Sequence, residues 1–158
     1  MTSKLDAGDI IIQKKNPISD QTTSYNLLND MNEAAYKAFE EFIPDVMNGS
    51  MKSFKQEKIS SIKFHYKKDK PNNGILDLSW DLSKISAFLR AYDYFVTSPF
   101  GKPMVRCDGE MYIWKKYKIM SCNLTSKSIC IDEHNLNVKG NGLKILLIGI
   151  EKYITDSE

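Results

Sequence analysis

The chain has 158 residues, a hydrophobic content of 42%, a charged content of 27% and a formal net charge of +2. This length suits one ordinary domain or two small units, and the composition is typical of soluble globular proteins. The small net charge does not by itself indicate a nucleic-acid partner. No apolar run approaches the ~18 residues of a membrane span and no signal-peptide pattern opens the chain, so we expect a cytoplasmic protein without a membrane partner.

An acid–Ala–Gly–acid turn near the N-terminus leads into three isoleucines, in the order Leu5-Asp6-Ala7-Gly8-Asp9-Ile10-Ile11-Ile12. Consecutive β-branched residues predict a buried strand over 9–14. Gly8 lets the backbone bend sharply, which places Asp6 at the mouth of that strand. A carboxylate held there can orient a base or a water, although a polar turn leading into a strand is an equally simple interpretation.

A long amphipathic helix is predicted over 23–43. Thr22 or Thr23 is the expected N-cap, Pro44 should end or kink the helix, and a last turn should stop at Gly49. The face expected to pack against the 9–14 strand carries the apolar residues Leu27, Met31, Ala35, Phe39 and Phe42.

Residues 5–50 resemble the formyltransferases that use 10-formyltetrahydrofolate, a family that includes methionyl-tRNA formyltransferases and sugar N-formyltransferases. The matching residues are Leu5-Asp6-Ala7-Gly8-Asp9-Ile10-Ile11, Gln13, Pro17-Ile18, Thr22-Thr23, Leu27-Leu28, Pro44 and Gly49. The resemblance implies that Asp6 is the catalytic aspartate, and that Leu5 and Asp6 lie at the 10-formyltetrahydrofolate cofactor.

The family also uses an Asn-x-His pair that lies upstream of this motif. The two histidines of this sequence, His65 and His134, do not follow an Asn at that spacing. The chain is therefore expected to be only the C-terminal part of such a protein. It would be completed by a separate N-terminal half, and a homodimer is a further possible assembly.

Residues 51–70 are strongly basic. Seven lysines oppose Glu57 and Asp69, a local balance of +5. The stretch is interpreted either as a solvated linker or as a phosphate-binding strip, for tRNA or for the diphosphate of a sugar nucleotide.

The rest of the chain, 71–158, predicts one helix and several strands. Asp81 or Ser83 should cap the helix, whose apolar face extends to Phe95. Strands are expected at 104–106, 111–119, 128–131, 135–138 and 143–150, with an Asp108-Gly109 hairpin turn. Short strands joined by tight turns suggest a small closed barrel.

This part resembles the OB-like C-terminal subdomain of the formyltransferases through Pro71 to Gly74, Asp77-Leu78 and Leu89-Arg90-Ala91. Leu78 stands where the family usually has Trp. The phrase Pro99-Phe100-Gly101-Lys102-Pro103 favours the sugar-formylating branch over the tRNA branch.

Cys107, Cys122 and Cys130 are odd in number and lack C-x-x-C spacing, so reduced, mostly buried thiols are expected rather than disulfides or a zinc site. His65, beside lysines, and His134, in an expected turn, are not predicted metal ligands.

The predicted fold class is α+β. Residues 1–50 are the end of a Rossmann-like formyltransferase domain, 51–70 a basic linker, and 71–158 a helix with an OB-like barrel. The function implied by the resemblance is formyl transfer to an amine, with an amino sugar nucleotide favoured over methionyl-tRNA as acceptor. The chain is expected to act as an enzyme only when an Asn-x-His half completes it. The alternatives are a non-catalytic nucleotide- or nucleic-acid-binding scaffold and a tRNA-facing domain.

Overall fold

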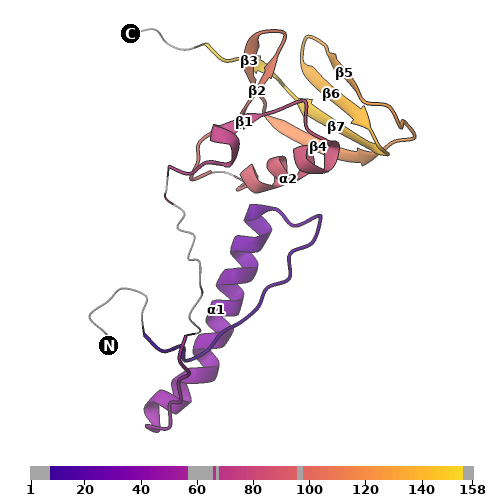
Figure 1. Ribbon diagram of the computed structural model, residues 1–158. Coiled ribbons are helices and arrows are strands. Elements are labelled where there is room, and N and C mark those ends of the chain that lie inside the picture. Colours follow the sequence, from indigo (N-terminus) through magenta and orange to yellow (C-terminus); the bar gives the residue numbers. More distant parts are fainter. Residues whose placement is uncertain (1–7, 57–65, 67, 96–97, 155–158) are drawn as a thin grey trace. The chain divides into compact units, whose positions relative to one another are not determined.

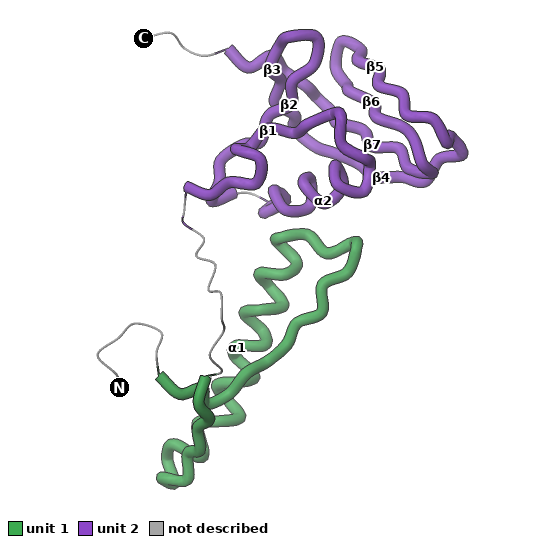
Figure 2. Tube along the Cα trace, viewed as in Figure 1, with its two compact units in different colours: residues 1–65 green, residues 66–158 purple. Residues whose placement is uncertain are grey.

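The structure is a computed structural model that describes residues 8–56, 66, 68–95 and 98–154. The chain, drawn as a ribbon in Figure 1, divides into two compact units, 1–65 and 66–158, which Figure 2 shows in different colours. Each unit is described by itself below.

Unit 1 is built on the helix α1 (Ser24–Met47). Thr23 is its N-cap, and the Thr23 hydroxyl oxygen accepts a hydrogen bond from the Asn26 amide at 3.1 Å. The helix continues past Pro44 to Met47, and Gly49 follows with a φ of 67°. The predicted cap and the final turn are therefore confirmed, because a hydroxyl satisfies a free amide at the start and glycine accepts the left-handed backbone after the end.

The predicted strand over 9–14 is wrong. Ile10 forms one isolated antiparallel bridge with Phe54, through backbone hydrogen bonds of 2.8 and 2.9 Å, and no strand extends it within the described part of the chain. The Ile11 side chain is 41% exposed. β-branched residues favour a strand because they fit a covered, pleated surface, and unit 1 offers no described neighbouring strand that would form one.

The predicted packing face of α1 is only partly correct. Leu27 and Phe42 are half-buried, whereas Ala35 is exposed and Met31 and Phe39 are each 52% exposed. No described residue of α1 is fully buried. A single helix with one extended segment cannot enclose a core, so part of its apolar stripe stays in solvent.

Unit 2 begins with a short 3-10 turn (Pro71–Gly74), the strand β1 (Ile75–Leu76) and the helix α2 (Leu82–Tyr92). Asp81 caps α2, since its Oδ1 accepts a hydrogen bond from the Lys84 amide at 2.8 Å. The helix ends at Tyr92, so the expectation that it reaches Phe95 is wrong. Phe95 has a φ of 66°, which no α-helix contains.

Two four-stranded sheets complete unit 2 (Figure 1). The first has the order β1-β2-β3-β8 and the second β4-β7-β6-β5. The remaining strands are β2 (Met104–Cys107), β3 (Glu110–Ile113), β4 (Lys116–Ser121), β5 (Ser128–Ile131), β6 (Asn135–Gly140), β7 (Leu143–Ile148) and β8 (Glu151–Lys152). β1 and β2 are parallel and the other pairs are antiparallel.

These sheets replace the predicted closed barrel, which the described residues do not form. The predicted strand 111–119 breaks after Ile113, and the predicted strand 143–150 breaks after Ile148. Gly149, with a φ of 65°, redirects the chain so that β8 joins the first sheet. The hairpin turn at Asp108-Gly109 is confirmed, with φ values of 49° and 82°.

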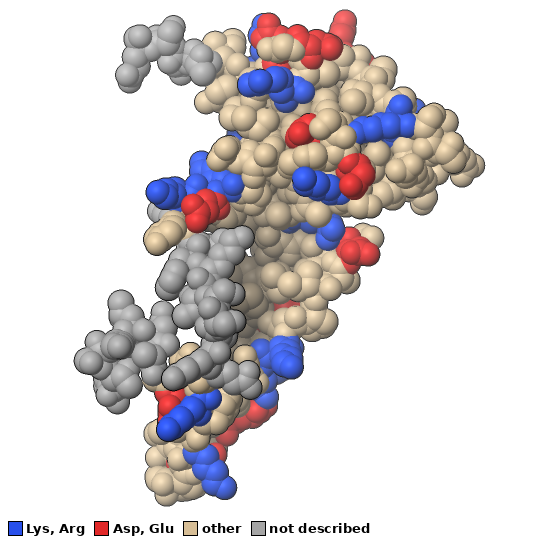
Figure 3. Space-filling model, in the orientation of Figure 1, with Lys and Arg blue, Asp and Glu red and all other residues tan. Residues whose placement is uncertain are grey.

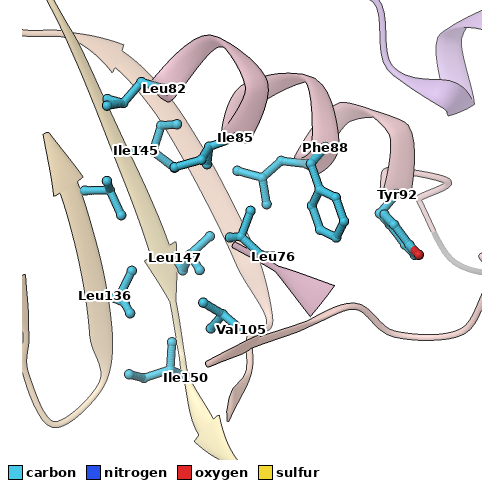
Figure 4. Packing of buried hydrophobic residues seen from close by; sticks show 12 residues of the cluster. Leu76, Leu82, Ile85, Phe88, Tyr92, Val105, Leu136, Ile145, Leu147 and Ile150 are labelled. Atoms are coloured by element: carbon cyan, nitrogen blue, oxygen red, sulfur yellow. The ribbon is translucent and has the colours of Figure 1, made fainter. Parts of the chain in front are cut away.

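The core of unit 2 lies between α2 and the sheets. In Figure 4 the side chains of Ile85 and Phe88 point from α2 toward Leu76, Ile145 and Leu147. All five are 5% exposed or less. The alternating burial along β6 and β7 follows the two-residue period of a strand with one covered face, which is why the hydrophobic pattern identified these strands.

Candidate functional site

The two site residues suggested by the sequence, Leu5 and Asp6, lie outside the described residues, so the structure does not test them. It does show how the chain is held just after them. The Gly8 carbonyl accepts a hydrogen bond from the Gln56 side-chain amide at 2.7 Å, and the Ser53 hydroxyl lies 3.4 Å from Asp9 Oδ2. Together with the Ile10–Phe54 bridge, these contacts pin the end of the motif to residues 53–56.

A cavity of about 590 Å³ lies within unit 2, where α2 ends. Its size falls within the ~300–1,000 Å³ of small-molecule sites. The lining carries both aromatic and charged side chains; it includes Tyr92, Asp93, Tyr94, Phe95, Lys102, Trp114, Lys115, Lys116, Tyr117 and Glu151.

Asp93 organises one wall of this cavity. It follows the last residue of α2, and its backbone amide donates to the Arg90 carbonyl. Its Oδ2 accepts a hydrogen bond from the Tyr117 hydroxyl at 2.7 Å, and its Oδ1 lies 3.4 Å from the Phe95 amide. One carboxylate thus links the helix end, β4 and the turn that carries Phe95.

The Tyr117 hydroxyl is held in its protonated form. Burial raises the pKa of Tyr117 well above its ordinary value, and the hydrogen bond to the Asp93 carboxylate raises it further. At neutral pH this group is therefore a hydrogen-bond donor rather than a base.

Two aromatic residues of the lining, Tyr92 and Tyr94, contact the ring of Phe100. Phe100 meets Tyr92 edge-on at a centroid distance of 5.7 Å and Tyr94 at 6.1 Å. The side chain of Phe95 is 79% exposed. Its left-handed backbone is rare for a bulky residue, and such outliers cluster at functional sites.

The charges around the cavity are unevenly matched. Lys115 forms an ion pair with Glu151 at 2.5 Å, and this contact is the main cause of the lowered pKa of Glu151. No ion pair joins Lys102 or Lys116 to a carboxylate of the described residues. On the face seen in Figure 3, basic and acidic side chains are interspersed in small groups.

Sequence reasoning missed this cavity. Tyr92 and Phe95 were assigned to one helical face, whereas Phe95 lies beyond the helix end. Asp93 and Tyr117 are 24 residues apart, and no sequence pattern indicates that they meet. The Pro and Gly residues over 98–103 indicated where the helix must end. They did not indicate that this segment borders an aromatic cavity.

Other predicted features carry no site in the described residues. His134 is exposed in the turn between β5 and β6, and its amide donates to Asp132 Oδ1 at 2.9 Å. Across 8–56, 66, 68–95 and 98–154, no three His, Cys, Asp or Glu side chains gather as a metal site requires.

Cys107 and Cys122 are half-buried and Cys130 is exposed. Neither described helix is long and apolar enough to cross a membrane.

The basic stretch 51–70 is described only in part, because residues 57–65 and 67 lie outside the described ranges. Lys52, Lys55, Lys68 and Lys70 are exposed. Their exposure fits both interpretations of the stretch, a solvated linker and a phosphate-binding strip.

No protein-family model matches the sequence. The fold is similar to that of the N-formyltransferase from Helicobacter canadensis, crystallised in complex with folinic acid and dTDP-3-aminofucose; the TM-score is 0.66 and the identity 21%, over 97% of this chain and 53% of that one. It is also similar to WlaRD, a sugar 3N-formyltransferase whose crystal structure contains dTDP and 5-N-formyl-THF, with a TM-score of 0.59 and 20% identity over 98% of this chain and 53% of the other.

The chain therefore spans about half the length of each structure it matches. At this level of identity the likeness establishes the fold. The predicted similarity in fold to formyltransferase structures is confirmed, and both of these structures are of the sugar-formylating kind.

Proposed function

We propose that this chain contributes to N-formyl transfer from 10-formyltetrahydrofolate to the amine of a sugar nucleotide. The observation that carries the proposal is the likeness in fold to two sugar N-formyltransferases over nearly the whole chain. The Leu5-Asp6-Ala7-Gly8-Asp9 motif supports it independently, because it resembles the family's motif in residue type and order.

In this proposal Asp6 is the orienting carboxylate, and Leu5 and Asp6 face the folate. Amine attack on a formyl group develops an oxyanion and releases a proton, so the reaction needs an oxyanion donor and a base beside any orienting acid. The family supplies these from an Asn-x-His pair. We propose that a separate polypeptide or a further segment provides the pair, and that residues 1–50, 51–70 and 71–158 are the successive parts of the family's architecture.

An amino sugar nucleotide is the favoured acceptor, since the two similar structures contain dTDP-3-aminofucose and dTDP. The cofactor assignment draws on the same structures, which contain folinic acid and 5-N-formyl-THF. Methionyl-tRNA is the competing acceptor, and the exposed lysines of 51–70 are the feature that would favour it.

The test is a formyl-transfer assay with 10-formyltetrahydrofolate and a dTDP-3-amino sugar, using the purified chain alone and mixed with a formyltransferase fragment that carries Asn-x-His. We expect turnover only in the mixture. Asp6→Asn should lower the rate about a hundredfold or more, because cooperating catalytic groups act as a unit.

Asp9→Asn is the matched control, since Asp9 is the second acid of the same motif and is exposed. It should keep most of the activity. Turnover by the chain alone that disappears in Asp6→Asn would contradict the need for a second half. Absence of turnover in every mixture would contradict the proposal itself, and formylation of methionyl-tRNA alone would reassign the acceptor.

A further inference from the structure

We infer that α1 pairs with the α1 of a second copy of this chain, in parallel and in register, through an apolar stripe along the helix. The stripe has Asn32 among its apolar members, which are Leu28, Met31, Ala35, Tyr36, Phe39 and Val46. The inference does not depend on formyl transfer, and it would hold for a binding module as well as for part of an enzyme.

The spacing of the stripe is that of a helix that pairs with another helix. Leu28, Asn32, Ala35, Phe39 and Phe42 follow one another in alternating steps of four and three residues. This is the a/d repeat, which keeps one side of a helix facing a parallel neighbour along its length. Phe39 and Phe42 already contact each other edge-on, with 5.4 Å between their ring centroids.

The described chain leaves this stripe in solvent. The exposed fractions are 47% for Leu28, 52% for Met31, 63% for Tyr36, 52% for Phe39 and 45% for Val46. With about 3.6 residues per turn, every charged residue of the helix lies outside the stripe; these residues are Asp30, Glu33, Lys37, Glu40, Glu41 and Asp45. Covering the stripe therefore requires no charge to leave water, as is typical of the centre of a protein interface.

The exposed area is sufficient for a dimer of modest affinity. A large side chain offers roughly 150–250 Å² of surface, and about half of it is exposed at these five residues. Together they contribute about 500 Å² on each copy and about 1,000 Å² in a pair, the lower limit for a specific interface. We therefore expect a dissociation constant in the micromolar range, with α1 unpaired in dilute solution.

Asn32 selects a second copy as the partner. A purely apolar partner would leave the donor and the acceptor of its side-chain amide without hydrogen bonds when the stripe is covered. The Asn32 amide of a second copy supplies one acceptor and one donor in return, and a single Asn in an a/d repeat fixes register in this way. An antiparallel pair aligned end to end would place Asn32 opposite Phe39, since both are equally far from the middle of α1.

The first experiment is sedimentation equilibrium of the full chain under reducing conditions, from about 1 to 200 µM. We expect a monomer–dimer equilibrium in which Phe39→Lys raises the Kd at least about tenfold, because a charge would have to be desolvated in the interface. Ile129→Lys is the matched control. Ile129 is an exposed apolar residue on β5, the edge strand of the second sheet, and its replacement should leave the Kd unchanged.

The second experiment tests the arrangement of the two helices and does not weaken the stripe with a charge. Under mild oxidation Leu28→Cys should form a disulfide-linked dimer, because a parallel, in-register pair brings the two copies of residue 28 together. Lys37→Cys is its control, since Lys37 lies outside the stripe and pairs with Glu33 on the exposed side of α1. Both variants keep the three natural cysteines, so only the position of the new thiol differs.

The inference is overturned if the chain is monomeric at about 200 µM, if Phe39→Lys leaves a dimer intact, or if Ile129→Lys dissociates it. It is also overturned if Leu28→Cys cross-links no better than Lys37→Cys, or if the chain associates only with a fragment that carries Asn-x-His. These measurements do not use formyl transfer. Failure of the dimer and failure of the proposed function are therefore seen in different assays and with different variants.

Discussion

At the scale of single residues, Asp93 joins the end of α2 to β4 and to the Phe95 turn. It directly follows the last residue of α2. Its carboxylate accepts a hydrogen bond from the Tyr117 hydroxyl at 2.7 Å and lies beside the Phe95 amide. A carboxylate that accepts a hydrogen bond in a partly buried place is stronger than a neutral acceptor, because its charge assists the bond. The pair therefore couples the stability of this region to the protonation state of Tyr117.

The direction of that coupling follows from the raised pKa of Tyr117. A group whose pKa is higher in the folded state contributes stability that is complete below its unfolded pKa, near 10, and is lost as the pH rises above that value. We expect the free energy of unfolding to fall with pH above about 10. Urea denaturation at a series of alkaline pH values should show a shallower fall in Tyr117→Phe.

The buried Tyr92, whose pKa is also raised by burial, contributes in the same direction and serves as the reference. The part of the alkaline fall in stability that comes from Tyr92 should therefore remain in the Tyr117→Phe variant. A pH profile identical in the wild-type chain and in Tyr117→Phe would contradict the assigned role of the Asp93–Tyr117 contact.

At the scale of elements, α1 differs from α2 in what covers it. α2 has six buried residues, whereas α1 has none among those described. The extended segment before α1 covers only one side of it, where Phe42 borders a hollow together with Ile11, Ile12 and Met51. The opposite apolar residues of the helix remain in solvent.

This arrangement predicts different effects for two neighbouring phenylalanines. Phe42→Ala should destabilise α1 by about 2 kcal/mol, roughly half the cost at a fully buried site, because Phe42 is half-buried. Phe39→Ala should cost less than about 1 kcal/mol, since Phe39 is 52% exposed and loses mainly its edge-on contact with Phe42. Hydrogen exchange of the α1 amides measures the destabilisation caused by each variant. Equal destabilisation would show that the buried side of α1 has been assigned wrongly.

At the scale of the whole molecule, the two units have different means of stabilisation. Unit 2 encloses a core of Leu, Ile, Val, Phe and Tyr side chains between α2 and two sheets. The described residues of unit 1 form one helix, one backbone bridge and two exposed ion pairs, Lys14–Glu41 and Lys37–Glu33. Exposed ion pairs contribute little, so unit 1 by itself is expected to be weakly stable.

We therefore expect the amides of β6 and β7 to exchange about a hundredfold or more slowly than those of α1 in the same chain. Hydrogen-exchange mass spectrometry provides the comparison without dividing the protein. Equal protection of α1 and β7 would mean that unit 1 is stabilised by something beyond the contacts described. Slow exchange of α1 that appears only after addition of an Asn-x-His fragment would also support the proposed function.

The sequence by itself determined the local features of this protein. Thr23 and Asp81 were each one of two residues predicted as a cap, and Asp108-Gly109 was predicted as a hairpin turn, because these features depend on the chemistry of a few adjacent residues. The strands of unit 2 were recognised in outline from their hydrophobic alternation. The likeness in fold to formyltransferases was also predicted, from the order of motifs along the chain. The role of Asp6 remains a prediction.

Only the tertiary structure decided where strands find partners and which residues meet across the chain. The isoleucines at 10–12 have the propensity of a strand, yet a strand forms only beside another strand, and the described part of unit 1 provides a single bridge. The supposed barrel opens into two sheets because the chain turns at Gly149. The cavity joins Asp93, Phe95 and Tyr117 through contacts between distant residues, and such contacts follow from packing rather than from local pattern.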